Sequence, residues 1–238
     1  MDNPGYVILT RQSGLMRSMD AIAHNIANIS TTGYRREALI FEEFVRATGH
    51  GTDSLSMANA NVRNIDRQQG PLSQTNGTFD FAIEGDGFFL VETPEGQMLT
   101  RAGSFTPSAE GELVAPDGAR LLDAAGAPVF VPADAASVAV SADGTLSVDG
   151  QPFAQLGLWE PLDPIDLNRR AGSRFLPDGG AQPIEGGVIL QGFLEDSNVD
   201  AITEIARMIE VQHAYEQGQK FLEREDERIR AVIRTLGQ

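Results

Sequence analysis

Two apolar stripes, one at each end of the chain, constrain this fold more than any other feature. Near the N-terminus, apolar residues recur at alternating steps of four and three, the spacing that lines one side of an α-helix. The C-terminal segment carries two such rows. The second row begins at Met208, one residue before Ile209, which is the last member of the first row. The N-terminal stripe is Leu15, Met19, Ile22, Ile26 and Ile29; the first C-terminal row is Val199, Ile202, Ala206 and Ile209; the second is Met208, Val211, Tyr215, Leu222, Ile229, Val232 and Leu236.

The two C-terminal rows predict assembly with other chains. Adjacent residues lie about 100° apart around a helix, so the C-terminal helix is apolar on two flanks, although Gly218 and Glu225 interrupt the second row. A single partner helix covers one flank, and we expect the second row to supply the surface for a neighbouring chain. Isolated helices of this kind are marginal in water, so we expect the terminal segments to be largely disordered in a free monomer and to fold on association.

Composition limits the classes of function. The chain has 238 residues with 41% hydrophobic content, which is enough for a packed core. A net charge of -16 disfavours binding to nucleic acid or anionic lipid. There is no cysteine for disulfide or thiolate chemistry, no run approaches the roughly 20 apolar residues of a membrane span, and residues 1–14 lack the pattern of a secretory signal. Any export is therefore expected to use a route without a cleaved signal of that type.

The N-terminal third predicts a helix followed by an extended region. The helix starts after Asn3-Pro4, because proline suits the first turn. It ends near Asn28 or Ile29, where turn formers and Gly33 follow. Residues 37–45 fit either a short helix or an extended arm, and the polar stretch 49–74 is typical of a linker or crossing segment.

The centre of the chain predicts antiparallel β-structure. From about Phe79, Asp-Gly and Glu-Gly turn signals recur between short apolar runs, which indicates short strands joined by tight turns. A last strand is expected over 187–194, with Ser197 or Asn198 as the N-cap of the C-terminal helix. The sequence thus predicts an α+β fold whose terminal helices pack together, coiled-coil-like, around a central β domain. Its segments are 1–33, a rod-like helix; 34–78, an extended arm or linker; 79–194, the β domain; and 195–238, the second helix.

No pattern of residues favours catalysis or metal binding. The glycine-rich segment 84–88 is followed by a strand and not by the helix that a phosphate cradle requires, so it indicates a tight turn. The histidines stand apart and match no metal-binding spacing. With 34 acidic residues in the chain, a carboxylate pair arises readily by chance. We therefore expect no catalytic residue, cofactor or metal site; the candidates weighed are His24, His50, His213 and the pair Asp163 and Asp166.

Two asparagines lie beside the N-terminal stripe. Asn25 and Asn28 are three residues apart and so share a helix face. They serve either as hydrogen-bonding groups at the helix end or as polar residues that bond to a neighbouring helix and fix its register.

Four segments together resemble one protein family. They are NIANISTTGYRR (25–36), FAIEGDGFFLV (81–91), TRAGSFTPSAEGELV (100–114) and GFLEDSNVDAITEIARMIEVQHAYE (192–216). In this order they resemble the flagellar basal-body rod and hook proteins. The length and both termini are most similar to the proximal rod proteins, and the distal rod proteins are the next most similar.

The resemblance implies a structural subunit of the bacterial flagellar rod and not an enzyme. Such a subunit is exported by the flagellar type III apparatus, without signal cleavage, and joins copies of itself and other rod proteins in the periplasm. Its terminal helices polymerise into a drive shaft that transmits torque, with no nucleic acid, membrane insertion or cofactor involved. The residues expected at the assembly interface are Leu15, Met19, Ile22, Asn25, Ile26, Asn28, Ile202, Ile209, Val211, Tyr215 and Leu222.

Two other classes of protein remain as alternatives. An acidic, β-rich hydrolase would use carboxylates such as Asp163 and Asp166, but it leaves the terminal helices without a role. A β binding module with helical oligomerisation arms explains both halves, and it differs from a rod subunit in forming closed small oligomers instead of filaments.

Overall fold

The computed structural model describes residues 3–46, 55–163, 167–170, 172–184 and 186–236. The chain divides into two compact units. The first, here called the helical unit, contains Met1–Ala27, Glu37–Asp66 and Asp200–Gln238. The second, the β unit, contains Asn28–Arg36 and Arg67–Val199. Helices and antiparallel strands are both extensive, which confirms the predicted α+β class.

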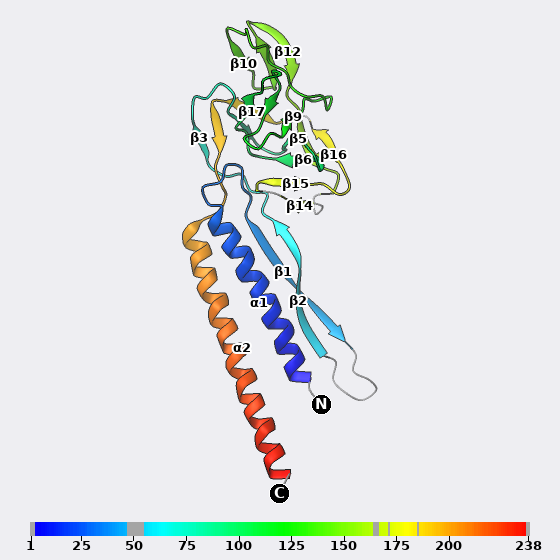
Figure 1. The fold of residues 1–238 in the computed structure, drawn as a ribbon, viewed down its shortest axis with the longest axis vertical. Coiled ribbons are helices and arrows are strands. Elements are labelled where there is room, and N and C mark those ends of the chain that lie inside the picture. Colours follow the sequence, from blue (N-terminus) through cyan, green and yellow to red (C-terminus); the bar gives the residue numbers. More distant parts are fainter. Residues whose placement is uncertain (1–2, 47–54, 164–166, 171, 185, 237–238) are drawn as a thin grey trace. The chain divides into compact units, whose positions relative to one another are not determined.

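The helical unit consists of two long helices and one hairpin. Helix α1 spans Asn3–Ala27 and packs along α2, which spans Ala201–Leu236 (Figure 1). Strands β1 (Glu37–Arg46) and β2 (Leu55–Ile65) form an antiparallel pair that lies against α1. Residues 37–45 are thus a strand and not a helix. The region 34–78 contains this hairpin, and its residues are shared between the two units.

Helix α2 begins later than the sequence pattern suggested. Neither Ser197 nor Asn198 is its N-cap: the side chain of Asp200 accepts a hydrogen bond from the Thr203 amide at 2.7 Å and so caps the helix. Asn198 instead accepts a hydrogen bond from the Arg36 amide at 2.6 Å. Because α2 starts at Ala201, Val199 is not part of its first apolar row, and it is buried in the β unit.

The β unit is built from short antiparallel strands. Its described residues form a seven-stranded sheet in the order β14, β15, β6, β5, β9, β8, β7, a three-stranded sheet and three two-stranded pairs: β13 with β16, β17 with β4, and β18 with β3. The bounds are β3 Leu72–Gln74, β4 Phe81–Glu84, β5 Phe89–Thr93, β6 Gly96–Thr100, β7 Thr106–Pro107, β8 Leu113–Val114, β9 Arg120–Leu121, β10 Val138–Val140, β11 Thr145–Val148, β12 Gln151–Gln155, β13 Leu158–Pro161, β14 Asn168–Arg169, β15 Arg174–Leu176, β16 Ala181–Ile184, β17 Val188–Gln191 and β18 Phe193–Glu195.

One apolar core joins these sheets. Phe89 lies at its centre and meets Phe105 edge to face, with ring centroids 5.9 Å apart. The expected last strand, 187–194, is two strands, because Gly192 takes a positive φ of 78° between β17 and β18. Fully buried members of the core are Phe81, Ile83, Phe89, Val91, Leu113, Leu121 and Leu146.

Candidate assembly surfaces

The apolar stripe of α1 is largely used inside the helical unit. Leu15 and Ile22 are 9% and 7% exposed, and Met19 and Ile26 are half-buried. On α2, the second apolar row supplies half-buried positions: Met208, Val211, Tyr215 and Leu222. The two helices therefore cover one flank of each other, as a pair of striped helices should.

Asn25 links three elements of the helical unit. Its side chain is completely buried, and its amide exchanges two hydrogen bonds with the backbone of Glu37, at 2.8 and 2.9 Å. The same amide nitrogen donates to the Glu204 carboxylate on α2 at 3.1 Å. Glu204 is 1% exposed and also pairs with Arg207 at 3.2 Å. Asn25 thus joins α1 to β1 and to α2 of its own chain.

Gln12 crosses from α1 to α2 at the glycine that interrupts the apolar row. Its Nε2 donates to the Tyr215 carbonyl at 3.2 Å, and a Cβ on Gly218 would lie 2.7 Å from that same nitrogen. Gly218 therefore makes room for a polar crossing between the helices. The sequence pattern showed this position only as a weak point of the stripe.

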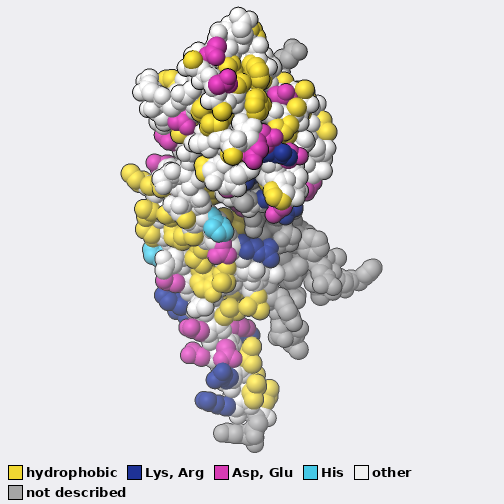
Figure 2. Space-filling model, turned by 45° about the horizontal axis from the view of Figure 1, so that its top comes forward, with side chains coloured by type: hydrophobic (Ala, Val, Ile, Leu, Met, Phe, Trp, Pro, Cys, Tyr) yellow, Lys and Arg dark blue, Asp and Glu magenta, His cyan; other side chains and the backbone are white. Residues whose placement is uncertain are grey.

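Two members of the first apolar row of α2 are left uncovered by the described residues: Ile202 is 80% exposed and Ile209 about half. Ile205, on the same helix face, is also about half exposed. The sequence pattern assigned the surface for a neighbour to the second row, but Met208, Val211, Tyr215 and Leu222 of that row are half-buried, so the exposed row here is the first. Figure 2 shows hydrophobic side chains gathered on the visible face of the helical unit, with charged groups interspersed toward the C-terminal end of α2. Exposed apolar groups that recur along one face mark an interaction surface. This row is the strongest candidate surface for assembly.

The predicted interface residues thus fall into two sets. Leu15, Ile22 and Asn25 are buried within the chain, whereas Ile202 and Ile209 are exposed on α2. Asn28 lies beyond the end of α1, where its side-chain oxygen accepts a hydrogen bond from Thr31 at 3.1 Å. The role of all of these residues in assembly stays a prediction, together with that of Met19, Ile26, Val211, Tyr215 and Leu222.

A buried ion-pair cluster organises the β unit. Glu195 accepts from Arg35 at 2.8 Å through one carboxylate oxygen and from Arg101 at 3.1 Å through the other. All three side chains are 3% exposed or less. The Gly70 amide donates to the same carboxylate at 2.9 Å, and Arg101 donates to the Gly85 carbonyl at 2.7 Å. Burial lowers the pKa of Arg101, and the neighbouring carboxylate opposes that effect.

This cluster was missed from the sequence although its members lie in three of the family-like segments. Arg35 lies in 25–36, Arg101 in 100–114 and Glu195 in 192–216. No local signal marked them, because each segment carries further charged residues, such as Arg36, Glu110 and Glu204. Gly33 shows how closely these segments meet: its φ is 66°, and a Cβ there would lie 2.2 Å from the Ala102 nitrogen. Only glycine fits that position.

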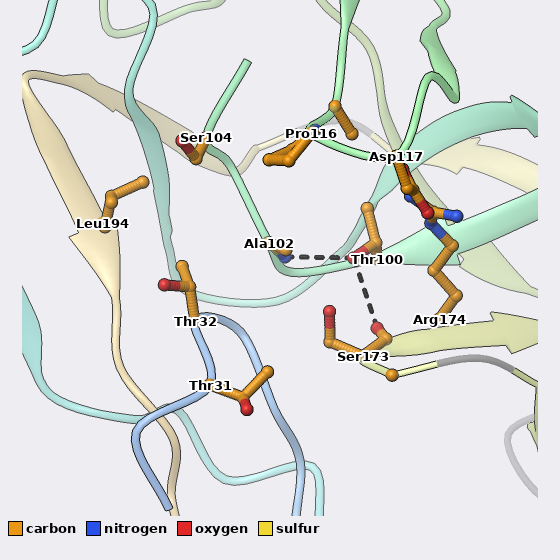
Figure 3. Close-up of a pocket in the computed structure, with 12 residues that line it drawn as sticks. Thr31, Thr32, Thr100, Ala102, Ser104, Pro116, Asp117, Ser173, Arg174 and Leu194 are labelled. Atoms are coloured by element: carbon orange, nitrogen blue, oxygen red, sulfur yellow. Dashed lines mark hydrogen bonds and ion pairs between the residues drawn. The ribbon is translucent and has the colours of Figure 1, made fainter. Parts of the chain in front are cut away.

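A cavity of about 460 Å³ lies beside this cluster in the β unit (Figure 3). Thr31 and Thr32 come from the loop after α1, while Thr100 bonds to the Ser173 carbonyl at 3.2 Å. At the rim, Arg174 pairs with Asp117, and its hydrogen bond lowers the pKa of that carboxyl. The lining residues offer small side chains and hydroxyl groups, so the cavity suits the packing of a polypeptide better than acid-base chemistry.

The described residues among those weighed for chemistry do not form a site. His24 and His213 are exposed on separate helices, and Asp163 is exposed on a loop; His50 and Asp166 lie outside the described residues. Gly85 and Gly87 take positive φ before β5, so segment 84–88 is the expected turn. Within the described residues no three histidine, aspartate or glutamate side chains group as metal ligands. Neither described helix is long and apolar enough to span a membrane.

Comparison with known proteins identifies the family. Residues 82–148 match the flagellar hook protein FlgE/F/G D1 domain, and residues 190–235 match the flagellar basal body rod FlgEFG protein C-terminal family. The flagellar basal-body rod protein FlgF of Mesorhizobium japonicum is 36% identical over all of this chain and 99% of the relative. The chain belongs to the flagellar basal-body rod protein family. Its members are structural proteins of the flagellum and not enzymes, and they associate with other rod and basal-body proteins.

Further relatives rank as the sequence resemblance predicted. FlgF of Caulobacter vibrioides is 36% identical over all of this chain and 99% of the relative. FlgG of Bacillus subtilis is 30% identical over 96% of this chain and 97% of the relative. The chain is thus more similar to these FlgF proteins than to this FlgG protein. This confirms the predicted order, in which proximal rod proteins (FlgF) come first and distal rod proteins (FlgG) second.

Proposed function

We propose that this rod protein is a proximal-rod subunit that polymerises in the periplasm through α1 and α2. The observation that carries the proposal is the uncovered row Ile202, Ile205 and Ile209 on a helix whose other flank is already packed on α1. Head-to-tail contacts between copies extend into a helical array instead of closing. The two helices then form a coiled-coil-like layer, and the interlocked layer transmits torque.

Export of the subunit is part of this proposal. The chain belongs to a family of flagellar basal-body rod proteins, and this relationship supports the export step. In the proposal, the subunit passes through the flagellar type III export apparatus without signal cleavage. Intact-mass measurement of the subunit recovered from basal bodies tests this step, because loss of N-terminal residues would contradict it.

Charge substitution in the uncovered row tests the assembly surface. Ile209→Asp places a charge in a contact that becomes apolar on assembly, and burial of an unpaired charge is costly. We expect this variant to be lost from purified basal bodies while the isolated protein keeps its circular dichroism spectrum. Glu210→Lys, at an exposed position about 100° around the helix from Ile209, is the control. Normal incorporation of Ile209→Asp would contradict the proposed surface.

A second variant distinguishes the two sets of predicted residues. Ile22 is buried against the chain's own elements, so Ile22→Asp should disrupt the helical unit itself as well as rod incorporation. The β unit, with its separate core, should remain folded, which limited proteolysis measures.

The position along the rod is tested separately. FlgG relatives cover the chain almost as fully as FlgF relatives, so a distal-rod role is the second candidate. In-cell crosslinking from position 209 with identification of the partner discriminates between them. Capture of distal-rod neighbours alone would contradict the proximal assignment.

A further inference from the structure

A second cavity, of about 310 Å³, opens between α1 and α2 inside the helical unit. Its walls are apolar side chains, including Leu15 from α1 and Phe221 from α2. Arg11 lies at its edge, and Gln12 and Gly218 also line it. The cavity is here called the α1/α2 socket.

The socket contains a buried hydrogen-bond acceptor with no donor among the described residues. Gln12 is 8% exposed, and its Oε1 has no hydrogen-bond partner there. The orientation of the amide is fixed by its other atom, because the Tyr215 carbonyl can only accept and so must face Nε2. A buried acceptor that lacks a donor destabilises a structure. An incoming N–H or O–H group would therefore complete this site.

The chain does not fill the socket with its own groups. Gly218 contributes no side chain, and the Gln12 amide already occupies the space where a Cβ would lie. Arg11 is exposed and takes part in no ion pair within the described residues. The socket thus presents apolar side chains next to Gln12 and Arg11. Among the described residues, the buried Gln12 Oε1 has no donor and Arg11 has no ion pair. Its occupant must combine an apolar face with a hydrogen-bond donor and a carboxylate.

The C-terminal part of α2 has that combination. Helix α2 has 36 residues and α1 has 25, and the last turns of α2 leave Ile229, Ile233 and Leu236 41%, 63% and 82% exposed. These positions lie on one helix face, because they recur at steps of four and three. Arg230 flanks that face and pairs with Asp226 at 2.9 Å, with both side chains more than half exposed. Exposed pairs of this kind are weak and exchange partners readily.

We infer that the socket receives the C-terminal face of α2 from a second copy of this chain. Ile229 and Ile233 of that copy pack on the apolar walls, Arg230 donates to Gln12 Oε1, and Asp226 pairs with Arg11. Copies in a head-to-tail array share one orientation. The socket of one copy is centred near residue 217, and the face inserted by the next copy is centred near residue 232. At 1.5 Å per residue, this places neighbouring copies about 22 Å apart along the axis of α2. This inference rests on the proposed assembly through the helices.

Photocrosslinking of the full-length protein tests the occupant. One sample of ¹⁴N protein carries a photoreactive residue at position 217, which lines the cavity. It is mixed with ¹⁵N protein that has no photoreactive residue. After self-association, mixed-isotope crosslinks should join position 217 to residues 226–236. Intermolecular crosslinks to another segment would overturn the socket while leaving assembly intact. Failure of the copies to associate at any concentration would contradict the proposed assembly itself, and with it this inference.

Removal of the acceptor gives an independent readout. Gln12→Leu keeps the approximate size of the side chain but cannot accept a hydrogen bond. It also removes the Nε2 hydrogen bond to the Tyr215 carbonyl, so the helicity of the associated protein is compared at the same time. A hydrogen bond to a charged donor contributes about 1.5–3 kcal/mol. We therefore expect self-association, measured by sedimentation, to weaken about 10- to 100-fold. Gln97→Leu, at an exposed position of β6 in the β unit, is the control. Equal association of the two variants, with unchanged helicity, would overturn the role of Gln12.

Discussion

The two units of this rod protein differ in how they cover their apolar residues. In the β unit, Phe89 and its neighbours are buried in one core, and the buried Glu195 meets two arginines at the same time. In the helical unit, Ile202 is 80% exposed and Ile205 and Ile209 are about half exposed. The β unit therefore has a core of its own, whereas the helical unit leaves a row of isoleucines uncovered by the described residues. We expect assembly to use the helices, while the β unit stays folded.

The largest expected effect is on hydrogen exchange. In dilute monomer, amides in 5–30 and 199–236 should exchange several orders of magnitude faster than those of β4 to β6, because little apolar area is buried per helical residue. On assembly, the helical amides should become protected. Exchange measured by mass spectrometry on monomer and on assembled protein gives both values. Strong protection of both helices in the monomer would remove the contrast between the units.

The next effect concerns the stability of the β unit. Glu195→Ala leaves Arg35 and Arg101 buried without their shared carboxylate, and such a loss costs about 3–5 kcal/mol. We expect the unfolding midpoint in urea to fall accordingly. Glu92→Ala is the control: Glu92 pairs with Arg120 at 2.6 Å, but both are about 40% exposed, so the cost is under about 1 kcal/mol. A similar loss of stability in both variants would show that the buried cluster stabilises the β unit no more than an exposed ion pair does.

The terminal helices were predictable because each is specified locally. Residues such as Leu15, Met19 and Ile22 recur with helical spacing, and the existence of a second row on α2 also predicted an uncovered flank. The turns of the β unit were equally local, since Gly85 and Gly87 follow short acidic signals. The sequence therefore predicted the fold class and the presence of an uncovered flank on α2. It assigned that flank to the second row, whereas Ile202 and Ile209 of the first row are the exposed residues.

The features that were missed depend on residues far apart in the chain. Arg35 and Glu195 are 160 positions apart, and no local pattern indicates that they meet. Strand β2 has no regular alternation of apolar and polar residues and pairs with β1, a partner that only the fold reveals, so its sequence was interpreted as a linker or crossing segment. Gly218 appeared to be a defect in a stripe, and only the position of Gln12 explains it. These features arise from tertiary structure rather than local periodicity.

Asn25 provides a smaller test within the helical unit. Asn25→Ala removes the hydrogen bonds to Glu37 and leaves the buried Glu204 carboxylate without one of its donors. The expected loss is about 1–3 kcal/mol of helical-unit stability, measured by circular dichroism during thermal unfolding. Asn64→Ala, at an exposed position of β2, should have no comparable effect. Unchanged assembly of Asn25→Ala, despite this loss, would mean that Asn25 acts only within its own chain.

The smallest effect is at the start of α2. Thr203 donates hydrogen bonds to the Asp200 carboxylate, and these bonds lower the pKa of that carboxyl. The charged carboxylate is thereby favoured at the N-terminus of α2, where the helix dipole is positive. A lowered folded pKa means that this stabilisation is fully present above the ordinary value of 3.8 and is lost as the pH falls through the lower folded value.

Nuclear magnetic resonance of the Thr203 amide measures this titration directly. In the unaltered protein, its chemical shift should titrate with a midpoint below 3.8, the ordinary value for an aspartate. Asp200→Asn keeps a capping oxygen but carries no titrating group, so its Thr203 signal should not follow that curve. A midpoint at or above 3.8 in the unaltered protein would show that the carboxylate does not cap α2. The start of this helix would then depend on its packing against α1 alone, and the helical unit would be even more dependent on contacts with other segments than its exposed isoleucines indicate.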